Sequence, residues 1–600
     1  WFALRLLEGD ATALAAADAP VSEEAAAQRQ RVEEALGEDI DIVLADARYS
    51  FVGKLLDGTL RRKRVVARSL SDRIDRLVLN RALGIPIFLL AMHLMFMFTI
   101  NIGGAFIDAF DIIAGAVAVD GVAALLGGLS APEWLIVLLA NGVGGGIQVV
   151  ATFIPIIAFL FLFLSVLEDS GYMARAAFVM DRFLRTIGLP GKSFVPLIVG
   201  FGCTVPAVMG TRTLEHERDR LMTIAMAPFM SCGARLPVYA LFAAAFFAAW
   251  GQMVVFLLYL IGIAAAILTG LILKHTLLRG PVTPFVMELP PYHLPTVKGV
   301  LIRTWERTRS FMFRAGRVIV PMVLVLNVLN SVGTDGSFGN EDTDTSVLSE
   351  VGRTITPLFV PFGVSEENWP ASVGIFTGVL AKEAVVGTLD SLYGAMAEDA
   401  AGESALRSQA NPKPLSWRAD KTEEALPVEE ETGFALLPLI GEGLATIPEN
   451  LIAALATWTD PLGLNIGDVG SAEAAAEAQE VEIGTFGAMS ERFDGAAGAF
   501  AYLLFILLYF PCAAAMGAVR REAGGRWAFF VGAWTTGMAY AVATLFYQIA
   551  TFGRDPATAT AWIAGVAVLC AAAIVAMRLR GARGTAAGLP GAMANPATPT

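Results

Sequence analysis

Two apolar stretches, one in each half of the chain, contain residues that a lipid bilayer should reject. The stretch 200–211 has three glycines and a proline within an apolar run, and the stretch 378–388 carries Lys382 next to Glu383. Irregular backbone is tolerated at membrane depth only where protein buries it or where it lines a cavity. Interrupted apolar segments at corresponding places in two halves indicate the binding region of a membrane transporter. We therefore predict an all-α polytopic membrane protein with two re-entrant hairpins that meet at one region.

The composition agrees with a membrane environment. Of the 600 residues, 55% are hydrophobic and 16% are charged, and the mean hydropathy is +0.61. Several apolar runs approach or exceed the ~20 residues that a helix needs to cross the hydrocarbon core. The net charge of −13 argues against a nucleic-acid partner, and the four cysteines lie in apolar segments rather than in an extracellular disulfide framework. The lipid bilayer is the expected surrounding, crossed by about eight transmembrane helices.

Basic residues predict the topology, because Lys and Arg concentrate on the cytoplasmic side. The arginine-rich segment 61–81 places the start of the first span inside, whereas 108–148 has no Lys or Arg and is expected outside. Between the spans we expect a hairpin at 193–210, turning around Pro206 and entered from inside, and a hairpin at 369–389, entered from outside. Both chain ends are then cytoplasmic. The predicted spans are 83–107, 149–167, 221–250, 253–273, 318–329, 500–519, 528–550 and 561–577.

The same pattern predicts how the chain is divided. The first part, 1–80, reads as a small soluble helical domain in the cytoplasm, with helices at 22–36, 41–52 and 64–79. Two units of opposite orientation form an inverted repeat, each with the order span, hairpin, span, span. The predicted parts after the first are 81–148 (first span and external interfacial segment), 149–273 (first repeat), 274–317 (cytoplasmic linker), 318–550 (second repeat, with a polar external insertion at 391–497) and 551–600 (last span and cytoplasmic tail).

Three cysteines lie beside helix-breaking residues inside these apolar segments. Cys203 follows Gly202 and precedes Pro206, Cys232 lies between Ser231 and a glycine, and Cys512 follows a proline. A single cysteine in a membrane is most often a small buried hydrophobe, and Cys570, which has no breaker beside it, is assigned that structural role. Three cysteines in related places predict a set of facing thiols along a transport path.

Sulfur ligands point to a late transition metal without selecting one. Met230 adds a thioether near Cys232. Thiolates and thioethers suit softer metals, but Fe²⁺ stands low in the order of divalent affinities. The pattern alone therefore does not single out iron.

Charged residues near the hairpins are the other candidates for the path or its gate. A charge at mid-bilayer costs roughly 2.5–3.5 kcal/mol on insertion scales, so such groups are usually paired or functional. Lys382 and Glu383 are predicted to shape the second hairpin, although the two could instead neutralise each other. Glu168 and Asp169, at the inner end of the second span, could receive a cation or could form an ordinary helix end.

Many ordered stretches resemble the ferrous iron transport protein B (FeoB) family, over essentially the whole chain. They include 45–49, 83–88, 98–104, 167–175, 191–196, 200–210, 226–235, 288–290 and 381–383. The resemblance implies an importer of Fe²⁺ in the bacterial inner membrane, whose two hairpins are Gate motifs. It implies Cys203, Cys232 and Cys512 as transient metal ligands. Some relatives carry a further cysteine where Phe229 stands here, which favours sparse sulfur sites over a fixed thiol cage.

The resemblance also implies parts that this chain lacks. Family members carry an N-terminal GTP-binding domain, with GTP and Mg²⁺, ahead of a helical domain like 1–80. No complete phosphate-binding loop occurs here, since Thr186 stands where the motif needs its first glycine before Gly191. We therefore expect no catalytic residue and no cofactor in this chain, and a relay role for 1–80. Expected partners are Fe²⁺, small cytoplasmic accessory proteins of the ferrous iron system and further copies of the chain.

Two other functions remain open from the sequence. A Gate-type carrier of a nucleoside or another organic solute would show a pocket near Asn327, Tyr393 and Tyr540. A membrane thiol redox or signalling protein would bring two cysteines within bonding range, with Cα atoms under ~7 Å apart.

Overall fold

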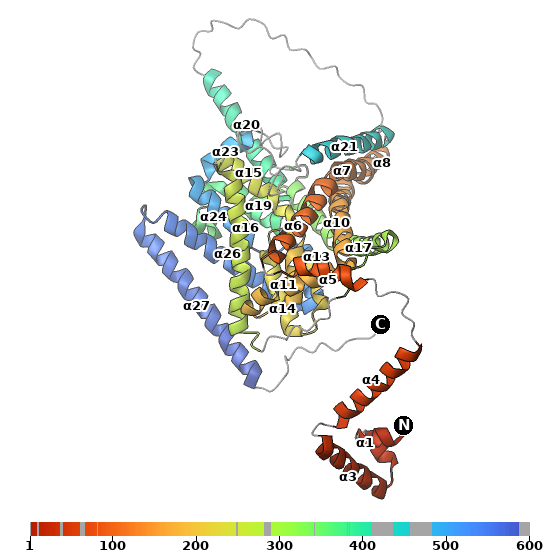
Figure 1. Cartoon of the computed structure of the whole chain (residues 1–600). Coiled ribbons are helices and arrows are strands. Elements are labelled where there is room, and N and C mark those ends of the chain that lie inside the picture. Colours follow the sequence, from red (N-terminus) through yellow and green to blue (C-terminus); the bar gives the residue numbers. More distant parts are fainter. Residues whose placement is uncertain are drawn as a thin grey trace. The chain divides into compact units, whose positions relative to one another are not determined.

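In the computed structural model the described residues form mainly helices (Figure 1). Among the residues that it describes, there are three isolated β-bridges and no strand. The described residues are 2–8, 11–36, 40–59, 67–80, 82–247, 250–280, 290–340, 343–380, 382, 384–409, 436–456 and 483–586.

The chain divides into two compact units, Trp1–Asp72 and Arg73–Thr600. The first unit contains α1 (Phe2–Leu7), α2 (Ala11–Ala16), α3 (Ala19–Leu36) and α4 (Ile40–Thr59). The helices predicted at 22–36 and 41–52 are thus present as α3 and α4. An ion pair of 2.6 Å between Arg48 and Glu8 ties α4 to the end of α1. The third predicted helix is α5 (Ala67–Val78), which straddles the boundary between the units.

Eight helical stretches in the described part are long and apolar enough to cross a membrane. This confirms the predicted number and order of spans. They are Gly84–Gly128, Trp134–Asp169, Glu217–Phe247, Gly251–His275, Val297–Ser331, Gly495–Ala523, Gly525–Ala550 and Pro556–Gly581.

The first and fifth spans, of 45 and 35 residues, exceed their predicted lengths most. The first does not end near 107 but continues through α6 (Gly84–Met97), η1 (Phe98–Ile102), α7 (Ile107–Gly115), η2 (Ala116–Asp120) and α8 (Gly121–Gly128). Its 45 residues would extend about 67 Å, more than twice the ~30 Å hydrocarbon core. A stretch without Lys or Arg indicates on which side of the membrane a segment lies, but it does not stop a helix from continuing. Likewise α17 (Val297–Ser331) is one helix, so it contains both the end of the predicted linker and the predicted fifth span.

The first hairpin is formed by α12 (Phe194–Gly202) and α13 (Thr204–Gly210), which pack against each other. The chain turns at Cys203, whose backbone is extended, and not around Pro206 as predicted. Pro206 is the third residue of α13, and a proline is tolerated in the first turn because the N–H it lacks would have no helical partner there. The second hairpin is formed by α19 (Trp369–Leu380) and α20 (Ala384–Gln409).

The order of elements is repeated. After α10 (Gly145–Asp169) come the first hairpin, a broken span and α16 (Gly251–His275). After α17 come the second hairpin, a broken span and α26 (Gly525–Ala550). Because α10 belongs to the second candidate span and α17 to the fifth, the order of elements agrees with the predicted inverted repeat, in which the two repeats cross the membrane in opposite directions.

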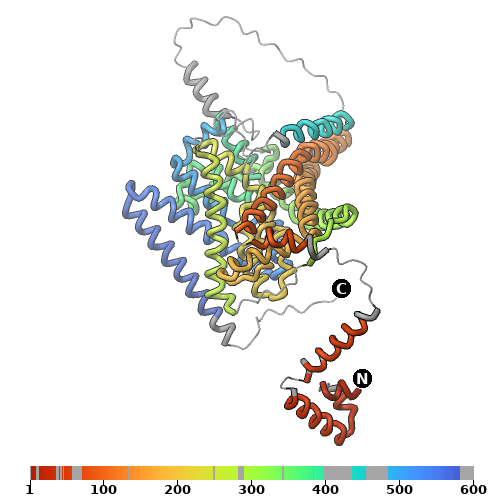
Figure 2. Tube along the Cα trace, in the orientation of Figure 1, coloured from red at the N-terminus to blue at the C-terminus, as the bar shows by residue number. Residues whose placement is uncertain are grey.

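The broken spans lie at the centre of the compact unit Arg73–Thr600. The first consists of α14 (Glu217–Met226), η6 (Ala227–Phe229), η7 (Gly233–Arg235) and α15 (Leu236–Phe247), and the second of α24 (Gly495–Leu508) and α25 (Ala513–Ala523). In α24 every residue from Gly498 to Leu508 is buried. In contrast α27 (Pro556–Ala586) packs on α26 at the edge of the bundle, as the blue end of the trace shows (Figure 2).

Candidate functional site

Each of the three predicted metal-path cysteines occupies the N-cap of a helix. Cys203 precedes α13, Cys232 precedes η7 and the adjoining α15, and Cys512 precedes α25. Their ψ angles of 132°, 160° and 154° show extended backbone where the helical path is broken. The first N–H groups of a helix have no intrahelical partner, and the helix dipole is positive at this end. Each cysteine therefore lies at the N-terminal end of a helix, beside the first backbone N–H groups of that helix.

The three breaks adjoin one another. A Cβ on Gly200, just before Cys203, would lie 3.1 Å from Cβ of Met230. Helix α13, which begins after Cys203, packs against α25, which begins after Cys512. Arg235 lies within electrostatic range of both Cys232 and Cys512. Sulfur-bearing breaks from both repeats thus converge in the interior.

The cysteines do not form a closed metal cage. Within the described part of the chain, no three Cys, His, Asp or Glu side chains lie close enough together to hold an ion. Cys203, Cys232 and Cys512 form no disulfide and are partly buried, whereas Cys570 is exposed on α27. Among the described residues, the three thiols therefore do not combine into one three-ligand site.

Two buried cations hold the carbonyl groups that the breaks release. Lys382 Nζ donates a 3.0 Å hydrogen bond to the Phe510 carbonyl and lies 3.1 Å from the centre of the Tyr509 ring. Both terminal nitrogens of Arg235 lie 3.4 Å from the Pro228 carbonyl oxygen. Lys382 and Arg235 are each 3% exposed, so these contacts form in a largely dry interior. A buried charge close to a released carbonyl fixes the geometry of the break.

Neither Arg235 nor its neighbour Tyr239 was singled out from the sequence as a site residue. Ser231, which was, shares a 3.0 Å hydrogen bond with the buried Tyr239 hydroxyl. The signal for Arg235 is an arginine inside an apolar span, two residues after a glycine, since charges within spans mark functional or paired sites. The other half of the predicted Lys382 pair, Glu383, lies outside the described residues.

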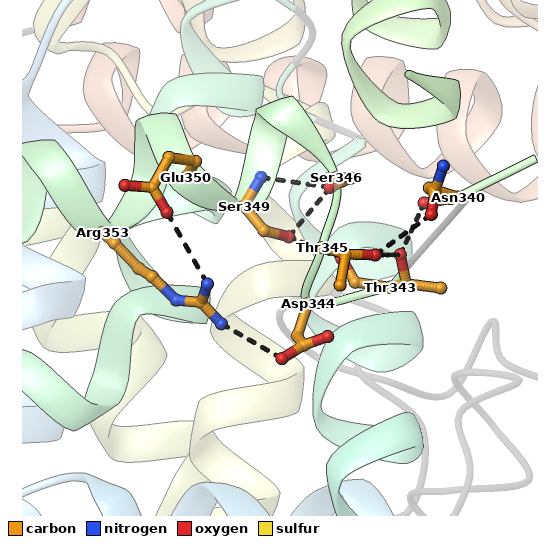
Figure 3. Close-up of polar contacts among 8 residues, drawn as sticks. All are labelled: Asn340, Thr343, Asp344, Thr345, Ser346, Ser349, Glu350 and Arg353. Atoms are coloured by element: carbon orange, nitrogen blue, oxygen red, sulfur yellow. Dashed lines mark hydrogen bonds and ion pairs between the residues drawn. The ribbon is translucent and has the colours of Figure 1, made fainter. Parts of the chain in front are cut away.

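The second hairpin is approached through a compact polar network (Figure 3). Ser346 Oγ caps α18 (Val347–Ile355) by accepting from the Ser349 amide at 3.2 Å. Arg353, on the same helix, forms ion pairs with Asp344 at 3.4 Å and Glu350 at 3.7 Å. Its guanidinium also stacks over the ring of Trp369, the first residue of α19, at 4.8 Å. The network therefore positions the start of the second hairpin.

Glu168 and Asp169, the predicted inner acceptors, have arginine partners on α17. Glu168 accepts from Arg307 at 2.8 Å, and Asp169 forms an ion pair with Arg303. A metal ion would have to compete with these arginines for the carboxylates. In this structure the two pairs join the end of α10 to α17.

A buried ion pair lies beside this corner. Arg175 on α11 (Tyr172–Ile187) donates to both carboxylate oxygens of Asp75 on α5, at 2.9 and 3.2 Å, and to the Gly171 carbonyl at 2.9 Å. Its guanidinium lies 4.0 Å from the centre of the Tyr292 ring. Burial, with a smaller effect of the Tyr292 phenol, raises the pKa of Tyr172 to about 12, so Tyr172 stays protonated at neutral pH. The pair fixes α5 on the membrane part.

An apolar cavity of about 490 Å³ adjoins the first hairpin. It is lined mainly by apolar side chains of α6, α11, α12 and α16. Phe201, Met230 and Gly233 also line it, and these three residues lie beside the helix breaks. Neither this cavity nor the smaller one described below is lined by Asn327, Tyr393 or Tyr540. Asn327 instead donates to the Asn141 carbonyl, and the buried Tyr393 donates to Asn368. The pocket expected of a nucleoside carrier is absent from both cavities.

Comparison with known sequences assigns most of the chain. The Gate family, described as nucleoside recognition, matches 150–246 and 312–526, in which both hairpins lie. The family of the ferrous iron transport protein B C terminus matches 255–307, and the FeoB cytosolic helical domain matches 1–61. No solved structure matches the chain.

Similar proteins include three that bear the name Fe(2+) transporter FeoB. The chain is 45% identical to that of Escherichia coli K12 over 93% of its own length and 67% of the relative. It is 44% identical to that of Shigella flexneri over 96% of the chain and 70% of the relative. For Salmonella paratyphi A the identity is 43% over 97% of the chain and 70% of the relative. On this evidence the chain is a multi-pass membrane protein and belongs to the FeoB family.

Proposed function

We propose that this chain moves Fe²⁺ across the membrane through the converging helix breaks. The observation that carries the proposal is the placement of Cys203, Cys232 and Cys512 at N-caps in adjoining interruptions of membrane spans. The name Fe(2+) transporter of relatives that are 43–45% identical supports Fe²⁺ as the substrate.

In this mechanism the thiols act in turn as thiolate ligands. A cysteine must lose its proton to bind a metal, and a helix N-terminus favours that loss. Sites with few ligands suit transport, because binding has to be favourable enough to admit the ion and weak enough to release it. Met230, beside the first hairpin, supplies a further soft ligand. Gly202 and Pro206 shape the first hairpin, and Ser231 and Lys382 shape the neighbouring breaks.

Arg235 has a charge-balancing role in this mechanism. Its guanidinium lies within electrostatic range of Cys232 and Cys512 and would neutralise a thiolate formed at either one before the metal arrives. An arriving Fe²⁺ takes over that neutralisation. Glu168 and Asp169 would then accept the ion at the inner end, in exchange with Arg307 and Arg303.

The cellular setting is part of the same proposal. The chain would lie in the bacterial inner membrane with both ends in the cytoplasm, importing Fe²⁺. In the family, GTP and Mg²⁺ bind a domain ahead of the helical region 1–80, which would relay the nucleotide state. Small cytoplasmic accessory proteins and further copies of the chain are the expected partners. The chain itself is proposed to hold no catalytic site and no cofactor.

The test is uptake of ⁵⁵Fe²⁺ into vesicles that contain the chain, joined to the family's GTP-binding domain and kept under reducing conditions. Single Cys→Ser changes at 203, 232 and 512 should each lower uptake, and the triple change should abolish it. Cys570→Ser is the matched control, because Cys570 is exposed on a peripheral helix with no break beside it. Uptake unchanged in the triple variant would refute the thiol mechanism. Absence of uptake by the unaltered protein would refute iron transport.

A further inference from the structure

A second cavity, of about 240 Å³, lies between α13, α17 and α25. Three arginines line it, Arg314 and Arg317 from α17 and Arg521 from α25. Val205 and Met209 of α13 form the wall toward the first hairpin. The cavity thus touches the helices that begin at Cys203 and Cys512.

The positive charge of this cavity is not compensated by the described part of the chain. None of its three arginines forms an ion pair there, and Arg314 donates only to the Ser310 hydroxyl. Glu522 is the carboxylate that attracts Arg314, but Arg212 already donates two hydrogen bonds to it, of 2.8 and 2.5 Å. Arg521 and Arg212 repel Arg314. An anion in the cavity would relieve this repulsion.

The cavity lies at the ends of the apolar parts of two spans, next to charged residues. On α17 the uninterrupted apolar run starts at Val318, just after Arg317, and on α25 Arg520 and Arg521 occupy the last turn. Basic pockets between spans at this depth are sites for the headgroups of anionic lipids. The volume is below the ~300–1,000 Å³ of drug-sized sites, so the occupant is a small group.

We propose that this cavity is a binding site for a phosphate-bearing anion, contributed by the headgroup of an anionic bilayer lipid. Guanidinium groups bind phosphate oxygens through paired hydrogen bonds, and two of the three arginines are exposed and able to turn toward a ligand. A phosphate here would bridge α17 to α25 and lie against α13. It would also lower the positive potential on the basic side of the breaks.

The consequence for transport rests on the proposed function. A divalent cation leaving the breaks toward this side meets three arginines, and a bound phosphate would reduce that barrier. Uptake of ⁵⁵Fe²⁺ should therefore be faster in vesicles with anionic lipid than in vesicles of phosphatidylcholine alone. Binding of the phosphate group does not depend on iron transport and is measured separately.

The binding experiment uses the purified chain and a double variant, Arg317→Gln with Arg521→Gln. Both side chains are exposed, so the variant should fold. The matched control is Arg309→Gln with Arg520→Gln, which removes the same charge from the same two helices outside the cavity. A second variant, Gly517→Leu, narrows the cavity and keeps the arginines, since a Cβ at Gly517 would lie 3.8 Å from Cγ2 of Val318, another lining residue. Retention of phosphatidylglycerol is read by native mass spectrometry, and the effect of inorganic phosphate by the shift in Tm.

We expect phosphatidylglycerol to bind the double variant roughly 30-fold more weakly, from about 1 kcal/mol for each basic residue. The Gly517→Leu variant should show a similar loss, and the control should bind like the unaltered chain. If lipid binding is equal in all proteins but the Tm shift with inorganic phosphate is lost only in the cavity variants, the site holds and its source is free phosphate. If neither readout depends on Arg317, Arg521 or Gly517, the proposal is overturned. Loss of ⁵⁵Fe²⁺ uptake alone, with phosphate binding intact, would bear on the proposed function and not on this site.

Discussion

At the scale of residues, the helix breaks are stabilised by cations as well as by proline and glycine. Breaking a span releases carbonyl groups, and each such group costs several kcal/mol if it stays unpaired in the bilayer. Lys382 bonds the carbonyl of Phe510 in the second repeat, and Arg235 lies next to that of Pro228 in the first. In both repeats a buried cation therefore lies next to a carbonyl group that the break releases, a lysine in one repeat and an arginine in the other.

We predict that Lys382→Met destabilises the protein by about 1.5–3 kcal/mol, the usual range for a hydrogen bond to a charged group. The methionine fills the space but leaves the Phe510 carbonyl without its donor. Thermal unfolding in detergent measures the effect. The control is Lys274→Met, because Lys274 also donates to a backbone carbonyl, that of Thr186 at 2.9 Å, but in an exposed position. Equal losses of Tm in the two variants would contradict a special role for Lys382.

The sequence predicted the cysteines better than it predicted their surroundings. Cys203, Cys232 and Cys512 could be singled out because glycine or proline beside each of them marks a local break in an apolar run. The position of the turn at Cys203 could not be read from Pro206, since proline is compatible with the first turn of a helix. The hydrogen bond from Lys382 to Phe510 joins segments 128 residues apart, and local patterns do not encode it.

At the scale of elements, the second hairpin packs closely against the broken span of its own repeat. A Cβ at Gly378 on α19 would overlap the Tyr509 hydroxyl and the side chain of Val385. Gly387, on the opposite arm of the hairpin, has no atom within 4 Å of such a Cβ. The two glycines therefore differ in what a methyl group would meet.

We predict that Gly378→Ala costs about 1–3 kcal/mol through overpacking and lowers transport. The change would push α19 away from Tyr509, and Lys382 at the hairpin tip would lose its position over that ring. Gly387→Ala should be neutral or stabilising by up to about 1 kcal/mol, because alanine favours a helix more than glycine does. Thermal unfolding and ⁵⁵Fe²⁺ uptake measured side by side distinguish the two. Wild-type behaviour of Gly378→Ala would show that the hairpin tolerates displacement.

A buried ion pair joins the amphipathic α5 to α11. Asp75→Asn leaves the guanidinium of Arg175, which is 1% exposed, without its carboxylate. Breaking a buried ion pair costs about 3–5 kcal/mol, so we predict a fall of this size in the free energy of opening α5. Hydrogen exchange of the α5 amides measures it. Glu215→Gln, which breaks the exposed pair with Lys192, should leave exchange of α5 unchanged. Equal protection of α5 in Asp75→Asn would show that other contacts hold the helix.

Hydropathy predicted the eight spans in order, but not where the longest ones end. The apolar pattern of the first span does not stop at the membrane surface, and only a turn at residues 105–106 separates the crossing from its extension through α7 and α8. In the described structure that extension packs against α21 (Leu436–Ala456), a helix within the predicted polar insertion. The length of the first helix thus reflects a distant contact.

At the scale of the whole molecule, the proposed function depends on two oppositely inserted units that share one centre. Each unit contributes a hairpin and a broken span, and the contact of α13 with α25 joins the first unit to the second. Opposite insertion requires that α10 and α17 cross the membrane in opposite directions. The number of crossings between them is therefore the property on which the architecture rests.

We predict that loops at the two ends of the spans react from opposite sides of the membrane. Single cysteines at Ser337 and Phe552, which lie after the fifth and seventh spans, should react with a membrane-impermeant maleimide in intact cells. Cysteines at Arg279 and Arg526, after the fourth and sixth spans, should react only once the membrane is opened, because Lys and Arg concentrate on the cytoplasmic side. The background carries Cys570→Ser, since Cys570 is exposed in the structure. If all four positions reacted from the same side, one crossing would be miscounted, and the two units could not be inverted with respect to each other.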